Sequence, residues 1–118
     1  MKRDIDLIRT IVLHVRDHGT QPDEVRGHSR KDLAYHCWLI FNGQLADGAD
    51  ASLGTDLAAK LYSLTWAGQN FADAVANESL WKEAMKAISR TTTSVSFDTL
   101  LHILAEMSVE RVRLLRSR

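Results

Sequence analysis

The residues of this chain that could bind a metal ion are four of its histidines and its single cysteine. They form two groups in the sequence: His28, His36 and Cys37, and the pair His14 and His18 at helical i, i+4 spacing. A zinc site needs three or four ligands that converge on one point. Adjacent residues such as His36 and Cys37 point about 100° apart on a helix, so they do not chelate one ion together. We therefore expect surface or core-edge histidines, and predict no metal site and no cofactor.

The sequence contains none of the familiar catalytic motifs. It has no Gly-x-Ser-x-Gly, no phosphate-binding loop and no His-Glu-x-x-His. Asp47, Asp50 and Asp56 could be imagined as a carboxylate set, but a glycine-bearing loop would hold them too loosely for acid–base catalysis. Cys37 lies in an apolar helical run, where a thiol is a poor nucleophile because its pKa rises. We therefore predict that the protein is not an enzyme.

Length and composition fit one small globular domain. The chain has 118 residues, of which 45% are hydrophobic and 25% are charged, both ordinary for a globular protein. No apolar run approaches the roughly 18 residues that a membrane-spanning helix needs. The acids within MKRDIDLIRTIV argue against a signal peptide. A single cysteine cannot form an internal disulfide, so we expect a protein of the reducing cytoplasm with no membrane partner.

Charge is distributed unevenly although the net charge is zero. Residues 1–36 carry +1, residues 37–80 carry −4 and residues 81–118 carry +3. The acidic middle section matters for the choice of partner, because it contains the segment that we expect to form a hairpin.

Apolar periodicity predicts two helices in the first third of the chain. Residues 4–18 repeat apolar side chains at three- and four-residue steps, and Gly19 is the expected stop. Residues 29–42 form the second helix, which Ser29 opens with a Ser-x-x-Asp pattern. The segment at residues 21–28 is too short for a helix of normal length, so we expect a turn and a short extended piece there.

The remaining chain predicts a hairpin and further helices. Short strands near residues 44–46 and 58–64 should flank a mobile acidic loop at residues 46–55. The expected N-caps of the helices that follow are Thr65, Asn77 or Ser79, and Ser96. A helix followed by a two-stranded hairpin indicates a winged helix, with the hairpin as the wing.

We therefore predict a mostly α protein with a small antiparallel β wing. It would be a single winged-helix-like domain over residues 1–118. Residues 1–76 would form the winged-helix core, and residues 77–118 a C-terminal helical extension.

Several segments of the chain share a pattern with a known family. They are MKRDIDLIRTIV, Ala34-Tyr35-His36, the stretch LTWAGQNFADA from Leu64 to Ala74, Trp81, and Ser94-Val95-Ser96-Phe97. Together they resemble the bacterial and prophage family catalogued as domain of unknown function 2513. The resemblance implies a winged-helix-like protein, often carried by phages and mobile elements, with no established catalytic residues. The chain departs from the family in the second helix, where usually charged positions hold Trp38 and Phe41 and where Gly43 falls one residue early.

DNA is one candidate partner, because a winged helix usually reads DNA with its recognition helix and contacts phosphate with a basic wing. The candidate contacts are polar residues of the second helix and arginines of the tail: Arg30, Lys31, Tyr35, Asn42, Arg111, Arg113, Arg116 and Arg118. The wing argues against DNA, because residues 44–61 hold three acids and only Lys60 as a base, and acids repel phosphate.

A protein is the other candidate partner. On a helical wheel Leu33, Cys37 and Ile40 share one face of the second helix, so its basic and aromatic residues fall largely on the other side. The interface candidates are Trp38, Phe41 and Tyr35 as anchors, Arg30 and Lys31 at the rim, and Asp47, Asp50 and Asp56 of the wing. Two alternatives remain: C-terminal helices cover Trp38 and Phe41, or this face forms a homodimer.

These observations favour a non-enzymatic, cytoplasmic interaction module, encoded by a phage or mobile element, that modulates or inhibits a host protein. Its acidic wing would suit a basic, nucleic-acid-handling partner, because the two surfaces would have complementary charge. The alternative is a winged-helix DNA-binding transcriptional regulator.

Overall fold

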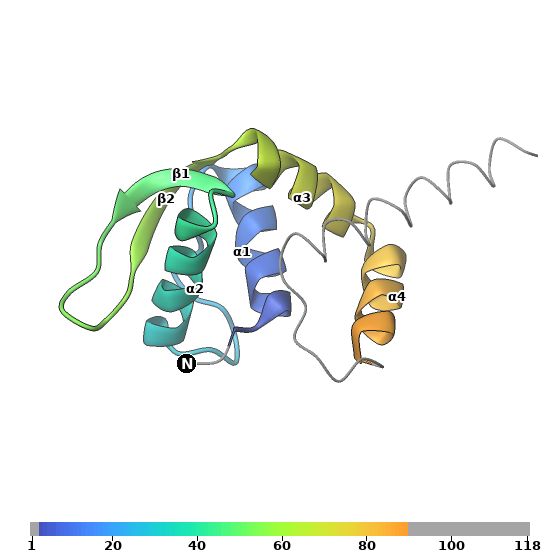
Figure 1. The fold of residues 1–118 in the computed structure, drawn as a ribbon, viewed down its shortest axis with the longest axis horizontal. Helices are drawn as coiled ribbons and strands as arrows, with labels where there is room; N and C mark the ends of the chain where they lie inside the picture. The colour runs from blue at the N-terminus through green and yellow to red at the C-terminus, as the bar shows by residue number, and fades with distance from the viewer. Residues whose placement is uncertain (1–2, 90–118) are drawn as a thin grey trace, which may run out of the picture. The chain divides into compact units, whose positions relative to one another are not determined.

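The computed structural model describes residues 3–89, with side chains described through residue 87 (Figure 1). Its elements, in order, are α1 (Ile5–His18), α2 (Arg30–Asn42), β1 (Ala46–Asp50), β2 (Ala59–Leu64), α3 (Trp66–Ala76) and α4 (Glu78–Ser89). The prediction of a mostly α protein with one small antiparallel hairpin is confirmed. The helix expected after Ser96 and the tail residues Arg111, Arg113, Arg116 and Arg118 lie outside the described residues.

The chain divides into two compact units, residues 1–72 and residues 73–118. In the second unit, Asn77 caps α4, because its side-chain oxygen accepts a hydrogen bond of 3.0 Å from the amide of Leu80. Leu80, Trp81 and Ala84 of this helix are buried. All described candidate site residues belong to the first unit.

Helix α1 ends before Gly19 as predicted and begins one residue later than predicted, at Ile5. Asp4 is the N-cap, and its carboxylate accepts a hydrogen bond of 3.2 Å from the amide of Leu7. Gly19 takes the left-handed conformation, with φ 74°, and its N–H bonds the carbonyl of Val15 at 2.8 Å. The apolar stripe of the helix is buried throughout and consists of Leu7, Ile8, Ile11, Val12 and Val15.

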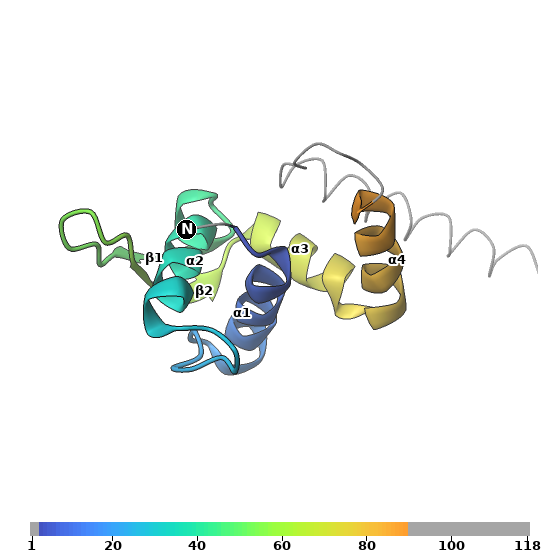
Figure 2. The ribbon, with the colours of Figure 1, turned by 90° about the horizontal axis from the view of Figure 1, so that it is seen from below.

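Helix α2 packs between α1 and the hairpin (Figures 1 and 2). Ser29 caps it as predicted, since its hydroxyl accepts a hydrogen bond of 3.0 Å from the amide of Asp32. The predicted inner face of Leu33, Cys37 and Ile40 is buried, and His36 is buried with them. The helix therefore has one apolar side against the core and one side left for other contacts.

Strand β1 corrects the predicted extent of the first strand. It runs from Ala46 to Asp50 and pairs antiparallel with β2, so half of the predicted mobile loop is strand. Alanine, glycine and aspartate have low strand propensity, and the pairing with β2 overrides it. Gly48 follows a bulge in the pairing, and a Cβ at this position would overlap the carbonyl oxygen of Lys60. Only glycine fits there without moving the backbone.

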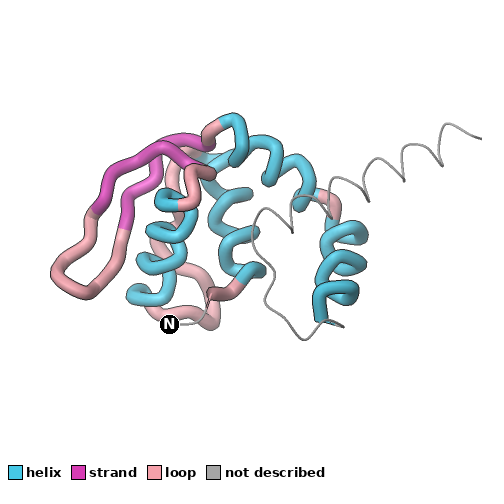
Figure 3. Tube along the Cα trace, viewed as in Figure 1, coloured by secondary structure: helices cyan, strands magenta, loops and turns pink. Residues whose placement is uncertain are grey.

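No strand forms between α1 and α2, where we expected a short extended piece. Residues 19–29 form only turns and coil (Figure 3). Instead of a strand, the side chain of Gln21 lies at the outer edge of β2. The Gln21 amide donates to the carbonyl of Ala59 at 3.2 Å and accepts from the amide of Leu61 at 2.6 Å. These are the two backbone groups that a neighbouring strand would pair with.

The start of α3 is tied to the end of α2. Thr65 caps α3 by accepting a hydrogen bond of 3.1 Å from the amide of Gly68, and its hydroxyl donates to the carbonyl of Gln44 at 2.6 Å. The amide of Thr65 also bonds the carbonyl of Leu45 at 3.1 Å. A Cβ on Gly68 would overlap that same carbonyl oxygen. The Thr-x-x-Gly pattern is thus explained by close packing, and it fixes where Trp66 stands.

Candidate functional site

His36 holds the beginnings of α1 and α2 together. Its side chain is fully buried. Its Nε2 accepts a hydrogen bond of 2.8 Å from the amide of Asp4, and its Nδ1 donates to the carbonyl of Asp32 at 2.8 Å. An acceptor at Nε2 and a donor at Nδ1 define the neutral Nδ1–H tautomer. Both ring nitrogens are therefore occupied, and His36 has a structural role.

The other three histidines that were considered as metal ligands also make local contacts. His28 Nδ1 lies 3.0 Å from the Asp32 carboxylate. His14 Nδ1 bonds the carbonyl of Thr20 at 2.7 Å, and the rings of His14 and His18 lie 4.4 Å apart between centroids. Among the residues that the structure describes, no group of three or more His, Cys, Asp or Glu side chains could hold a metal ion.

Cys37 is buried, and burial raises the pKa of its thiol to about 12. A thiol with such a pKa is protonated at neutral pH, and the protonated form is not the nucleophilic one. The side chain packs in the core beside Leu33 and Ile40 on the same face of α2. Cys37 therefore serves as a small apolar core residue.

The two cations that open α2 both face carboxylates. Lys31 Nζ lies 3.2 Å from Asp56 of the hairpin loop, and Arg30 Nη2 lies 3.8 Å from Glu24. All four side chains are largely exposed, so each pair stabilises the fold by only about 0–1 kcal/mol. The main effect of the two ion pairs is on the surface potential, because the carboxylates offset the positive charge expected at the start of α2.

The predicted aromatic anchors are only partly accessible. Tyr35, Trp38 and Phe41 are half-buried, while Asn42 is exposed. The rings of Tyr35 and Trp38 are stacked, with centroids 6.5 Å apart and planes 13° apart. Tyr35 and Trp38 form an aromatic strip along the outer side of α2. Part of the surface of this strip is exposed and could contact a partner.

The three hairpin acids are exposed at separate places. Asp47 and Asp50 lie on β1, and Asp56 lies in the loop. Hydrogen bonding with the Ser52 side chain, and a hydrogen bond of 2.8 Å from the Ser52 amide, lower the pKa of the Asp50 carboxyl group. Asp56 pairs with Lys31, as described above. The structure therefore spreads the acids along the hairpin.

Three large apolar side chains are exposed that sequence reasoning did not select. Trp66 is 84% exposed, Leu53 80% and Tyr62 53%. Two signals could have found the aromatic ones. Because side chains alternate along a strand, Tyr62 lies on the other face of β2 from its buried neighbour Leu61. On the α3 wheel Trp66 stands opposite buried Val75.

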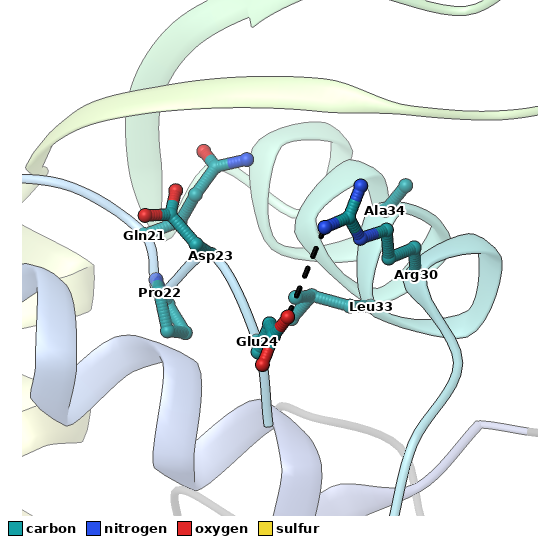
Figure 4. A pocket seen from close by; sticks show the side chains of 7 residues that line it. All are labelled: Gln21, Pro22, Asp23, Glu24, Arg30, Leu33 and Ala34. Atoms are coloured by element: carbon teal, nitrogen blue, oxygen red, sulfur yellow. Dashed lines mark ion pairs between the residues drawn. The ribbon is translucent and has the colours of Figure 1, made fainter. Parts of the chain in front are cut away.

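An open concavity of about 730 Å³ lies between the α1–α2 connection and α2 (Figure 4). Its lining comes from both segments: Gln21, Pro22, Asp23, Glu24, Arg30, Leu33 and Ala34. Its charged side chains, Asp23, Glu24 and Arg30, are exposed. Small-molecule sites are usually enclosed and mostly apolar, so this hollow suits contact with a macromolecular surface better.

No helix among the described residues is long and apolar enough to cross a membrane.

Comparison with known proteins places the chain in a family. An uncharacterized protein of Haemophilus influenzae (strain KW20 / Rd) is 26% identical over 108 residues, covering 87% of this chain and 92% of that protein. No solved structure matches the chain. The sequence profile of the family described as "Hypothetical protein (DUF2513)" matches residues 2–94, so the chain belongs to the DUF2513 family.

Proposed function

We propose that this protein is a non-enzymatic module that binds another protein through the outer side of α2 and the adjacent hairpin. The observation that carries the proposal is the charge arrangement at this surface. Both cations of the α2 start face carboxylates, and the hairpin adds exposed Asp47 and Asp50. Such a surface favours a protein partner over a polyanion.

The same arrangement disfavours the alternative, a winged-helix DNA-binding regulator. The order of α2 followed by a hairpin is what favours that alternative. Non-specific DNA affinity, however, comes mostly from neutralising phosphates with Lys and Arg. Residues 44–61 contain three aspartates against Lys60 alone. A phosphate backbone approaching this hairpin would meet net negative charge.

The aromatic strip on α2 supplies the apolar part of the proposed interface. Tyr35 and Trp38 are stacked and half-buried, so their rings are held in place before a partner arrives. Tyrosine, tryptophan and arginine are enriched among residues that dominate interface energies. Arg30 and Lys31 would form the polar rim, as would the hairpin acids.

The family resemblance gives this proposal its setting. A protein of a phage or mobile element that works in the cytoplasm would meet host proteins, and binding would modulate or inhibit one of them. A partner with a basic surface, such as one that handles nucleic acid, would complement the hairpin.

Site-specific cross-linking tests this function. A photoreactive amino acid at Asn42, on the exposed end of α2, should capture a defined protein in cells, and the same amino acid at exposed Thr10 of α1 is the matched control. The captured protein, purified separately, should bind the unmodified chain in calorimetry, and Trp38→Ala should weaken that binding.

A DNA titration tests the alternative function, a DNA-binding regulator. Labelled duplex DNA should bind the unmodified chain weakly at low salt, and the combined change Arg30→Gln with Lys31→Gln should alter that binding little. Tight duplex binding with a steep salt dependence that these two changes abolish would contradict the proposed function and support the regulator.

A further inference from the structure

The geometry points to the base of the hairpin as the docking site for a basic protein segment, one whose Arg or Lys side chain packs on Trp66 and Tyr62 and pairs with Asp47. This inference rests on the proposed protein-binding function and names the site and partner chemistry. We use "hairpin base" for the surface of Asp47, Tyr62, Ser63 and Trp66.

The exposed aromatic rings are the first argument. Trp66 leaves 84% of its surface in solvent and Tyr62 leaves 53%. The two residues are four positions apart, on either side of the turn from β2 into α3. Tryptophan and tyrosine are the residue types most enriched at interface hot spots. Their exposure is not needed for the fold, because Phe71 supplies the buried aromatic ring of α3.

The rigidity of this turn is the second argument. Thr65 accepts from Gly68 and donates to Gln44, and its amide bonds Leu45. Gly68 lies so close to Leu45 that a Cβ has no room. The backbone that carries Trp66 is therefore held from two sides. Because this backbone is already fixed, a partner that binds Trp66 does not pay the entropic cost of ordering it.

The local charge selects the partner. Asp47 is exposed and is the register partner of Ser63, at the same end of the hairpin as Tyr62. Residues 42–48 and 61–72 contain no Lys or Arg. A cation that binds here can lie against an aromatic ring, which contributes about 0.5–2 kcal/mol, and can reach a carboxylate. An acidic segment or a phosphate would meet Asp47 and would have only exposed Lys60, one residue before the second stretch, to pair with.

Two other occupants fit less well. A second copy of the chain in a two-fold arrangement would bring its own hairpin base against this one, and thus one Asp47 toward another. Addition of a strand to β1 is disfavoured by the exposed Asp47 and Asp50 of this edge strand, because charged side chains on an edge strand hinder strand pairing. Side-chain recognition of a basic segment avoids both problems.

A peptide selection tests the inference directly. A displayed library of random 12-residue peptides is selected on the immobilised full-length chain, and enriched sequences are made as labelled synthetic peptides. Enriched peptides should contain Arg or Lys, and replacing these with Gln should abolish binding. Trp66→Ala should weaken binding about tenfold or more, and Asp47→Asn about threefold.

Leu53→Ala is the matched control, because Leu53 is an exposed apolar residue of the same hairpin, in its loop and away from the base. It should change affinity less than twofold. Thermal melting checks that Trp66→Ala folds, which its exposure predicts.

The outcomes separate this inference from the proposed function. Enriched peptides without Arg or Lys, no enrichment at all, or binding that survives Trp66→Ala would overturn the hairpin base as the site. If peptides bind but Trp38→Ala abolishes binding instead, the protein-binding function stands and the site is α2. Association of two copies that Trp66→Ala disrupts, seen by ultracentrifugation, would replace the basic segment with a second copy. If the chain binds duplex DNA tightly and no peptide, both fail.

Discussion

The beginnings of α1 and α2 and the hairpin base differ in how completely their groups are paired. At the first region His36 is fully buried and both of its ring nitrogens have hydrogen-bond partners. At the hairpin base the backbone is equally well fixed, yet Trp66 and Tyr62 face solvent. A fold gains nothing from an exposed tryptophan, so the difference separates side chains that stabilise the molecule from side chains free for a partner.

The largest expected effect is at Gly68, where the two kinds of role meet. Gly68→Ala places a Cβ against the carbonyl oxygen of Leu45, which forces the α3 start away from the end of α2. We expect a loss of about 3 kcal/mol in the free energy of unfolding, measured by urea denaturation. Gly54→Ala is the control, because Gly54 has a positive φ but open space around it, and should cost about 1 kcal/mol. Equal losses for the two variants would contradict the close packing at Gly68.

The next effect is at His36, whose removal leaves a cavity and an unpaired amide. His36→Ala should lower the free energy of unfolding by about 2 kcal/mol, since an unsatisfied buried donor alone costs about 1–3 kcal/mol. His18→Ala, at an exposed position of α1, should change it by less than about 0.5 kcal/mol. Nitrogen NMR of the imidazole should find the proton on Nδ1; a proton on Nε2 would contradict the hydrogen bond from Asp4.

Burial of Cys37 predicts a loss of stability at alkaline pH. The thiol pKa is about 12 in the folded chain and about 8.5 when unfolded. The folded state therefore retains a proton that the unfolded state loses, so the free energy of unfolding should fall as pH rises above the unfolded value. The slope from this group approaches about 1.4 kcal/mol per pH unit. Urea denaturation between pH 8 and 10.5 measures it, and Cys37→Ala should have a shallower slope; identical slopes would show that the thiol titrates normally.

The smallest expected effect is at the pair of Lys31 and Asp56. Both side chains are largely exposed and 3.2 Å apart, so a double-mutant cycle of Lys31→Gln and Asp56→Asn should give a coupling below about 0.5 kcal/mol. A coupling well above 1 kcal/mol would mean that the hairpin loop is anchored to α2 more firmly than this contact suggests.

Local sequence signals were sufficient for the parts of the fold that depend on local chemistry. Asp4, Ser29, Thr65 and Asn77 cap their helices by side-chain bonds to amides three residues ahead, so their residue types carry the signal. Strand β1 could not be placed, because its Ala, Asp and Gly residues form a strand only through pairing with β2. The Gln21 contact with β2 spans 38 to 40 residues, and no local pattern encodes it.

The candidate site was less predictable, for the same reason. The face of α2 that carries Trp38 follows from the helical period, but how far the ring is buried depends on distant segments. The pairing of Lys31 with Asp56 joins α2 to the hairpin loop and changes the apparent charge of the helix start. The exposure of Trp66, by contrast, follows from the helical period, which places it opposite buried Val75 on α3.

The three tryptophans provide the most direct test that binding occurs at the hairpin base. Each indole N–H gives its own NMR signal, and Trp38, Trp66 and Trp81 report on α2, the hairpin base and α4. The account predicts that an Arg-bearing peptide from the selection shifts the Trp66 signal in proportion to its occupancy and leaves the other two nearly unchanged. A peptide that shifts the Trp38 or Trp81 signal while that of Trp66 stays in place would contradict it.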